Sequence, residues 1–309
     1  MNNSNNLPHI PVLLQETLNA FTTIKDGIFI DCTLGYGGHS SEILKEHPNI
    51  SLIGIDRDDE ALNFSKKRLS EFLDRIELKK GSFSEVLQEI DFSKVTGLLA
   101  DFGVSSLQLD KLERGFSFSS ENLDMRMDQS SPFSAKELVN NYSLEELTRI
   151  FKEFGEIKEA KKLALAIIKA REKKPIESSL ELAELISKTI KKKGKIHPAT
   201  LPFQAIRMEV NKELDEITKL LDILEKKRPK GAIIALITFH SLEDRLVKQR
   251  FRKWSKKCIC PEGIMRCECG NDNNLGIELS KKPISATSKE LQENPRSRSA
   301  KLRVFQFKE

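Results

Sequence analysis

The chain has 309 residues, 39% of them hydrophobic, so it is long enough to bury one large core or two smaller ones. Its 51 Lys and Arg residues against 46 acidic residues give a net charge of +5, which permits nucleic-acid binding without requiring it. No stretch has the length and apolarity of a transmembrane helix or the pattern of a signal peptide, so we expect a cytoplasmic protein with no membrane partner.

The segment Phe29 to Ser40 is the first strong signal in the chain. Residues 28–30 predict a buried strand, Gly35 to Gly38 a tight turn that another molecule can approach closely, and Ser40 the start of a helix. This order predicts the first unit of a doubly wound nucleotide-binding fold. The turn alone is weak evidence, because glycine also serves packing at strand-to-helix junctions that bind nothing.

Acidic residues follow three of the apolar strands. Asp31 ends the first strand, Asp56 ends the run 51–55 and Asp101 ends the run 95–100. Because parallel strands bring their carboxyl ends to one sheet edge, we expect one site rather than three separate helix caps. Asp56 lies about 20 residues after the turn, where a carboxylate can accept the two hydroxyls of a ribose. Asp31 would repel a pyrophosphate but suits the ammonium and sulfonium of S-adenosylmethionine.

Three further features of the first half bear on this site. The N-terminal segment 9–16 is expected to pack over the sheet edge. The short strand 76–78 is followed by Phe83, which either stacks on an adenine or belongs to the core, and both interpretations stay open. Residues 105–133 show little periodicity, and so long a connection is typical of a lid or a binding loop.

Residues 134–193 change to consecutive amphipathic helices. Ser143 and Glu146 predict a capping box, Gly155 a C-cap, and Pro175 a break between two later helices. We therefore expect a helical insertion between the fourth and fifth strands. It ends in a lysine run that we interpret as a solvated helix end rather than a nucleic-acid site, made of Lys188, Lys191, Lys192, Lys193 and Lys195.

The last third of the chain returns to the α/β pattern. Apolar spacing predicts a helix over 203–214, and the run 231–238 predicts the fifth strand. Residues 302–307 alternate between apolar and polar side chains, which predicts a final strand at the edge of the sheet.

A basic helix and a group of cysteines follow the fifth strand. Ser241 and Asp244 predict a capping box for a helix whose basic residues interleave with Phe251 and Trp254, a better nucleic-acid candidate than the lysine run. Four of the five cysteines come next, at Cys258, Cys260, Cys267 and Cys269. Their clustering fits a reducing compartment. They suffice for a closed zinc site, but Cys-x-Cys spacing is shorter than usual, so zinc and plain reduced thiols stay open as alternatives.

Several of these motifs together resemble the ribosomal small-subunit RNA methyltransferase H family. The matching segments keep one order along the chain and are residues 9–14, 31–40, 103–106, 113–118, 124–128, 203–214, 241–245 and 294–299. The resemblance implies a Rossmann-like class I methyltransferase, an α/β protein with a doubly wound sheet and an inserted helical domain. It also implies methylation by S-adenosylmethionine of the N4 amine of a cytidine in the decoding region of 16S rRNA, with the rRNA in an assembled small subunit. A homodimer stays open.

The resemblance assigns individual residues and parts of the chain as well. Together with the predicted loop and helical insertion, it leads us to expect a first part of the methyltransferase core over 1–108, a lid loop and helical substrate-binding insertion over 109–202, and the second part of the core over 203–309. The cofactor contacts fall on Gly37, Gly38, His39, Asp56, Phe83, Asp101 and Gln108, of which His39 and Gln108 come from the resemblance alone.

Methylation of a cytosine amine requires a group that aligns the nitrogen and accepts its protons, because its lone pair is delocalised into the ring. Asp101 and the turn Ser105-Ser106 lie where that acceptor is needed, so we predict these three as catalytic residues. Two other functions stay as alternatives. One is a non-catalytic RNA-binding factor for ribosome assembly, and the other is a methyltransferase that acts on a small molecule or a protein.

Overall fold

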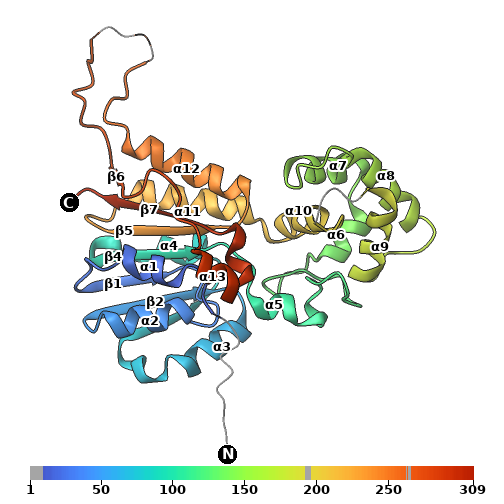
Figure 1. Ribbon diagram of the computed structural model, residues 1–309, viewed down its shortest axis with the longest axis horizontal. Coiled ribbons are helices and arrows are strands. Elements are labelled where there is room, and N and C mark those ends of the chain that lie inside the picture. The colour runs from blue at the N-terminus through green and yellow to red at the C-terminus, as the bar shows by residue number, and fades with distance from the viewer. Residues whose placement is uncertain (1–9, 192–195, 262, 264–265) are drawn as a thin grey trace, which may run out of the picture. The chain divides into compact units, whose positions relative to one another are not determined.

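The computed structural model describes residues 10–191, 196–261, 263 and 266–309 (Figure 1). The chain forms two compact units. The first unit contains the residues up to Gly103 and from Leu214 onward, and the second unit runs from Val104 to Glu213. Three residues of the predicted lysine run, Lys192, Lys193 and Lys195, lie outside the described residues. Across the described ranges, no helix has both the length and the apolarity that crossing a membrane requires.

The first unit is built on a seven-stranded sheet in the order β3-β2-β1-β4-β5-β7-β6. The strands are β1 (Gly27–Asp31), β2 (Ile50–Asp56), β3 (Ile76–Lys80), β4 (Val95–Asp101), β5 (Ile233–Thr238), β6 (Gly276–Glu278) and β7 (Lys301–Phe307). The first five strands pair in parallel, and β7 runs antiparallel to both of its neighbours. This arrangement confirms the expected α/β, Rossmann-like fold with a doubly wound sheet.

The prediction of a final edge strand was wrong, because β7 lies between β5 and the three-residue strand β6. The alternation of apolar and polar residues along β7 does not mean that one face of the strand is exposed to solvent. Arg303, a polar position of the pattern, is 3% exposed, and its Nε donates at 2.7 Å to Oδ1 of Asp244 on helix α12 (Ser241–Ser255). Pairing on both sides and a buried ion pair therefore place β7 inside the sheet.

Helices cover both faces of the sheet (Figure 1). The helices of this unit are α1 (Leu14–Ala20), α2 (Gly38–Glu46), α3 (Asp59–Arg68), α4 (Phe83–Glu89), α11 (Glu213–Lys227), α12 (Ser241–Ser255) and α13 (Ser288–Glu293), with 3-10 turns at Ser70–Arg75, Phe92–Lys94 and Pro295–Ser299. Apolar residues of α1 and α2 pack on one face, and those of α4, α11 and α12 pack on the other. The pattern analysis did not predict α11.

The second unit has its own helical core. Its helices are α5 (Ser106–Asp110), α6 (Ala135–Asn141), α7 (Leu144–Glu153), α8 (Ala160–Arg171), α9 (Ser179–Thr189) and α10 (Thr200–Asn211), with a 3-10 turn at Leu112–Arg114. Phe203, Ile206 and Val210 of α10 pack in the same apolar cluster as Leu147 and Ile150 of α7. The unit therefore spans residues 104–213, wider than the 109–202 expected from sequence, because its core includes α10.

Two predicted helix starts had different outcomes. The capping box of α7 is present, since Ser143 accepts from the N–H of Glu146 and the Glu146 carboxylate accepts from the N–H of Ser143. At α12 the prediction of Ser241 and Asp244 was wrong by one residue. His240 is the N-cap and pairs with Glu243, which leaves Asp244 for Arg303.

Candidate active site

Asp31, Asp56 and Asp101 end three strands that share one edge of the sheet, and we call them the strand-end carboxylates. Strand β1 lies between β2 and β4, and all three run parallel, so their carboxyl ends meet there. Burial raises the pKa of Asp31 and of Asp56 to about 6 and the pKa of Asp101 to about 7. Repulsion between neighbouring carboxylates raises two of these pKa values further, since Asp56 acts on Asp31 and Asp31 acts on Asp101. No Lys or Arg in the described ranges forms an ion pair with them. The edge is therefore electrostatically suited to an added cation.

Asp31 organises the turn that follows it. Its side chain is 2% exposed, and it accepts hydrogen bonds from the N–H of Thr33 at 3.1 Å and from the hydroxyl of Ser40 at 2.6 Å. The Thr33 hydroxyl oxygen in turn accepts from the N–H of Asp101 at 2.6 Å. The sequence analysis did not identify Thr33 or Ser40 as partners. Asp side chains often accept a hydrogen bond from the backbone N–H two residues later in a turn, so Asp31 before a predicted turn could have indicated the Thr33 bond.

Asp56 ties the end of β2 to the glycine turn. Its Oδ2 accepts from the N–H of Gly35 at 2.7 Å, and its Oδ1 accepts from the N–H of Asp58 at 2.9 Å. Each carboxylate oxygen has a second lone pair, so both can still accept from a ligand hydroxyl. The structure thus leaves Asp56 able to bind the two hydroxyls of a ribose.

Asp101 is the least satisfied of the three carboxylates. Its Oδ1 accepts from the N–H of Gly103 at 3.3 Å, and its Oδ2 accepts no hydrogen bond from any residue that the structure describes. A carboxylate with one open oxygen can accept a hydrogen bond from a substrate N–H.

The glycine turn is covered by the N-terminal segment. A Cβ at Gly38 would lie 2.5 Å from Cγ of Pro11, so only glycine allows this contact. Nε2 of His39 lies 2.9 Å from the carbonyl oxygen of Val12, and the ring is 8% exposed. Gly37 has a φ of 67°, which also favours glycine. The segment predicted to pack over the sheet edge therefore packs directly on the turn.

Two residues near the C-terminus hold that segment in place. Asn294 donates through Nδ2 to the carbonyl of Ile10 at 3.1 Å, and Glu290 accepts from the N–H of Leu13 at 2.7 Å. Neither was predicted to support the site, because the contacts span more than 270 residues of sequence and no local pattern reports them.

Phe83 is the first residue of α4 and belongs to an apolar cluster. Its ring is 8% exposed, its centroid lies 6.2 Å from that of Phe102, and the Arg57 guanidinium lies 5.8 Å from the ring. These contacts agree with a core residue whose ring is partly covered by a cation. Stacking on an adenine stays a prediction.

Comparison with known proteins identifies the family. Residues 6–308 match the model described as the MraW methylase family. The chain belongs to this family. It is 60% identical over 301 residues to the ribosomal RNA small subunit methyltransferase H of Sulfurovum sp. (strain NBC37-1), covering 97% of this chain and 98% of that protein. The protein of the same name from a Nitratiruptor species is 58% identical, covering 98% of this chain and 100% of that protein.

Membership of the MraW methylase family confirms the resemblance inferred from the motifs. Among solved structures, an rRNA methylase from Streptococcus thermophilus aligns over 97% of this chain and 99% of its own, with 11% identity and a TM-score of 0.40.

The remaining predicted contacts of this MraW methylase family member lie in the second unit. The N–H of Ser105 donates to Oε1 of Gln108 at 3.1 Å, and the N–H of Gln108 donates to the Ser105 hydroxyl at 3.3 Å. The two residues thus stabilise the start of α5 together. The Ser106 side chain lies outside the described residues. Roles of Ser105, Ser106 and Gln108 in catalysis or cofactor binding stay predictions.

The long connection after Ser105 is anchored to the helical core. Met125 is 1% exposed and Phe116 is 7% exposed. Asn211 donates to the carbonyl of Met125 and accepts from the N–H of Met127, both at 2.8 Å. Phe116 and Met125 are therefore core residues of the helical unit.

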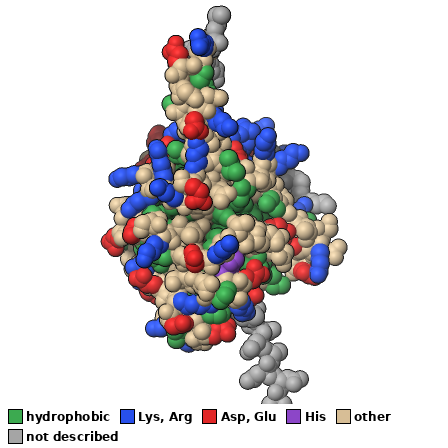
Figure 2. Space-filling model, turned by 90° about the vertical axis from the view of Figure 1, so that its left-hand side faces the viewer, with side chains coloured by type: hydrophobic (Ala, Val, Ile, Leu, Met, Phe, Trp, Pro, Cys, Tyr) green, Lys and Arg blue, Asp and Glu red, His purple; other side chains and the backbone are tan. Residues whose placement is uncertain are grey.

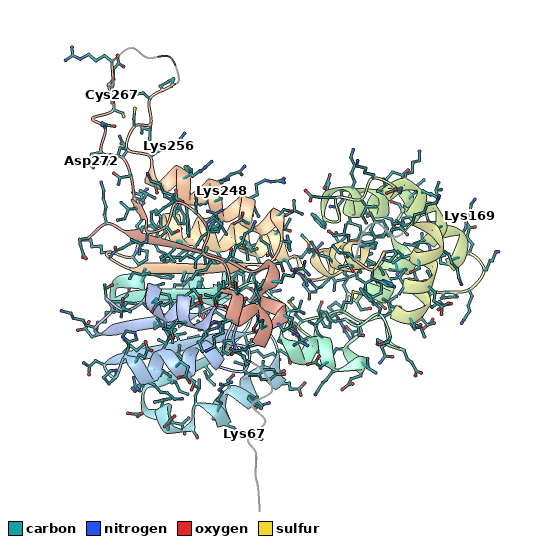
Figure 3. The ribbon with its side chains drawn as sticks, viewed as in Figure 1. Lys67, Lys169, Lys248, Lys256, Cys267 and Asp272 are labelled. Atoms are coloured by element: carbon teal, nitrogen blue, oxygen red, sulfur yellow. The ribbon has the colours of Figure 1, made fainter. Side chains whose placement is uncertain are left out.

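The prediction that Phe251 and Trp254 of α12 belong to a nucleic-acid surface was wrong. Phe251 and Trp254 are 0% and 1% exposed and pack against Phe305 of β7, so they are unavailable to stack on bases. Arg250 and Lys253 are both paired with Glu225 of α11. In Figure 3, Lys248 lies on α12 and Lys256 follows the end of the helix.

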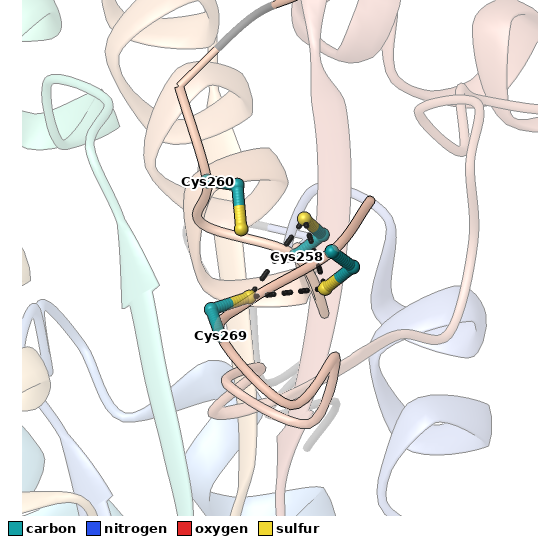
Figure 4. A group of neighbouring side chains, drawn as sticks. Cys258, Cys260 and Cys269 are labelled. Atoms are coloured by element: carbon teal, nitrogen blue, oxygen red, sulfur yellow. Dashed lines mark hydrogen bonds between the residues drawn. The ribbon is translucent and has the colours of Figure 1, made fainter. Parts of the chain in front are cut away.

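The four clustered cysteines are brought together in the first unit. Cys258, Cys260, Cys267 and Cys269 place their Sγ atoms within 4.8 Å of one another, and none forms a disulfide (Figure 4). They lie beyond the C-terminal end of α12. The strand-end carboxylates lie toward its N-terminal end, since α12 begins shortly after β5, whose Ile237 pairs with Asp101.

Proposed function

We propose that this protein transfers a methyl group from S-adenosylmethionine to the N4 amine of a cytidine in the decoding region of 16S rRNA. The observation that carries the proposal is the group of strand-end carboxylates, which meet at one sheet edge with raised pKa values and no cationic partner among the described residues. Clustering of three carboxylates without a cationic partner disfavours their charged forms, and a cationic ligand would relieve this cost. The names of the curated relatives support rRNA of the small subunit as the substrate.

In this proposal each part of the edge has a separate task. Asp56 accepts from the ribose hydroxyls of the methyl donor while it holds the glycine turn through Gly35. Asp31 acts indirectly, because its hydrogen bonds to Thr33 and Ser40 keep the turn in shape. Gly37, Gly38, His39, Phe83 and Gln108 are proposed as further contacts of the donor, as the family resemblance implies.

Asp101 is proposed as the group that orients the cytosine amine. When bound, S-adenosylmethionine supplies an electrophilic methyl group on a sulfonium. The open Oδ2 of Asp101 accepts a hydrogen bond from one amine N–H and so directs the nitrogen lone pair away from the ring. When the N–C bond forms, the nitrogen must lose one proton. A carboxyl whose pKa is raised to about 7 is matched to take up that proton near neutral pH.

We propose further that Ser105 and Ser106 help to hold the amine, and that the helical unit and its long connection contact the rRNA of an assembled small subunit in the cytoplasm. We assign zinc no part in the reaction, since the cysteines and the carboxylates lie toward opposite ends of α12. A homodimer is compatible with the proposal but not required by it.

Deletion of the gene and mapping of cytidine methylation across 16S rRNA test the proposal. We expect loss of N4-methylation at one cytidine of the decoding region, restored by the wild-type gene and not by a gene that carries Asp101→Asn. Unchanged modification in the deletion strain refutes the proposal. If the Asp101→Asn gene restores the methylation, and the deletion strain assembles small subunits poorly, the result would favour a non-catalytic assembly factor instead.

A further inference from the structure

The segment between α12 and β6 has no hydrophobic core of its own. We call residues 256–274 the cysteine loop. No residue from 256 to 273 that the structure describes is buried, and Ile259 is 63% exposed. Figure 2 shows the loop projecting from the surface of the first unit, and Figure 3 places Lys256 and Asp272 at its base with Cys267 farther out. Ordering such a segment costs about 1–2 kcal/mol of backbone entropy per residue, which apolar burial does not offset here.

Among the described residues of the loop, the hydrogen bonds between backbone groups lie at its base. The N–H of Asn273 donates to the carbonyl of Lys257 at 2.9 Å, and the N–H of Leu275 donates to the carbonyl of Trp254 at 2.7 Å. Beyond this base, the groups that converge are the four thiols. The four thiols are therefore the groups of the described loop that can stabilise it beyond its base.

The sulfur atoms have the spacing of a tetrahedral metal site. The Sγ atoms of Cys258, Cys267 and Cys269 form a triangle with sides of 3.7, 3.6 and 3.7 Å, and Cys260 brings the fourth sulfur within 4.8 Å of the others (Figure 4). Four thiolates at the usual Zn–S distance of about 2.3 Å stand about 3.8 Å apart. A disulfide would require about 2.05 Å.

Backbone N–H donors point to two of the four sulfur atoms, which suits thiolates at this position. The N–H of Ile259 points to Sγ of Cys269 at 3.3 Å, and the N–H of Glu268 points to Sγ of Cys260 at 3.4 Å. Such donors stabilise thiolate ligands and fix their direction.

We propose that Cys258, Cys260, Cys267 and Cys269 bind one zinc ion in a closed, purely structural site that folds the cysteine loop. All four positions of the tetrahedron are protein sulfur, so no position remains for a water or a substrate. The α12 helix, with 15 residues and a length of about 22 Å, separates the loop from the edge of the strand-end carboxylates. The zinc site is independent of the proposed methyl transfer.

Metal content of the full-length protein, purified without chelators, tests this site. We expect about one zinc per chain by atomic emission. Cobalt exchanged into the site should give the visible bands of tetrahedral thiolate coordination. Cys258→Ser and Cys267→Ser should each lose the zinc and the bands. Cys32→Ala is the matched control, because Cys32 is a buried cysteine just after β1, outside the cluster, and should leave both unchanged. Absence of zinc and of cobalt bands overturns the proposal, as does recovery of the four thiols as disulfides.

A second measurement separates a structural ion from one bound by chance. The loop offers trypsin Lys256, Lys257 and Arg266, so chelation of zinc should raise cleavage there by at least about tenfold while the sheet stays intact by circular dichroism. Readdition of zinc should reverse the effect. Equal cleavage of loaded and metal-free protein overturns the structural role. Proteolysis does not depend on methylation, so its result tests the zinc site independently of the proposed function.

Discussion

The backbone N–H of Gly35 donates a 2.7 Å hydrogen bond to Oδ2 of Asp56, across 21 residues of sequence. This bond joins the end of β2 to the glycine turn after β1. One carboxylate therefore both shapes the turn and faces the site where the methyl donor is proposed to bind.

Replacing Asp56 tests this double role. Asp56→Ala removes the acceptors for Gly35 and Asp58 together with the proposed ribose contact, so we expect S-adenosylmethionine to bind at least about tenfold more weakly, equivalent to about 1.4 kcal/mol. Calorimetric titration measures the dissociation constant. Asp59→Ala removes a nearby exposed acid and serves as control. Wild-type affinity in Asp56→Ala would exclude Asp56 as a cofactor contact.

Affinity for the methyl donor should rise with pH. The pKa values of the strand-end carboxylates lie at about 6, 6 and 7 without ligand, so part of their charge is missing below neutral pH. A cationic donor favours the deprotonated forms, and its binding should release protons between about pH 5.5 and 7.5. Calorimetry in two buffers of different ionisation enthalpy at pH 6.5 measures the released protons. Proton uptake, or an affinity that falls from pH 6 to 8, contradicts the expectation.

Asp101→Asn should separate catalysis from stability. The variant loses the acceptor and the base proposed for the amine, so we expect a decrease in kcat of at least about 100-fold at saturating S-adenosylmethionine. Single-turnover methylation of small subunits from a deletion strain measures the rate. A rate within about threefold of wild type would mean that another group orients the amine.

The same variant should gain stability at alkaline pH. Because the folded-state pKa of Asp101 is raised above its unfolded value, the folded protein holds this proton more tightly, and stability is lost as pH rises from about 4 to about 7. Asn carries no charge at any pH. Asp101→Asn should therefore be more stable than wild type at pH 8, by on the order of 2 kcal/mol, and nearly equal to it at pH 4. Denaturant unfolding at both pH values measures the difference, and destabilisation at pH 8 contradicts it.

Gly38→Ala should dislodge the N-terminal segment. The added Cβ would lie 2.5 Å from Cγ of Pro11, and overpacking of this kind costs about 1–3 kcal/mol. Thermal unfolding of Gly38→Ala, Pro11→Ala and the double variant measures the coupling. The double variant should be more stable than the sum of the two single effects predicts, because Pro11→Ala removes the clash. Strict additivity would show that Pro11 is not what limits position 38.

The sequence by itself determined the elements that carry the candidate site. Short apolar runs ending in Asp31, Asp56 and Asp101 predicted three strands and their acidic ends, and the structure agrees because these patterns depend only on neighbouring residues. The glycine turn and the capping box at Ser143 could also be predicted from the sequence, since turns and caps are local structures.

Only the tertiary structure decided how those elements are used. In the tertiary structure β7 lies inside the sheet, and Phe251 and Trp254 are buried in the core. Helix α10 packs in the core of the helical unit. The tertiary structure also put Pro11 on Gly38 and gathered four thiols at one point. Each of these depends on contacts between residues distant in sequence. A hydrophobic period shows that a side chain is buried, but the partner that buries it is set by packing of the whole chain.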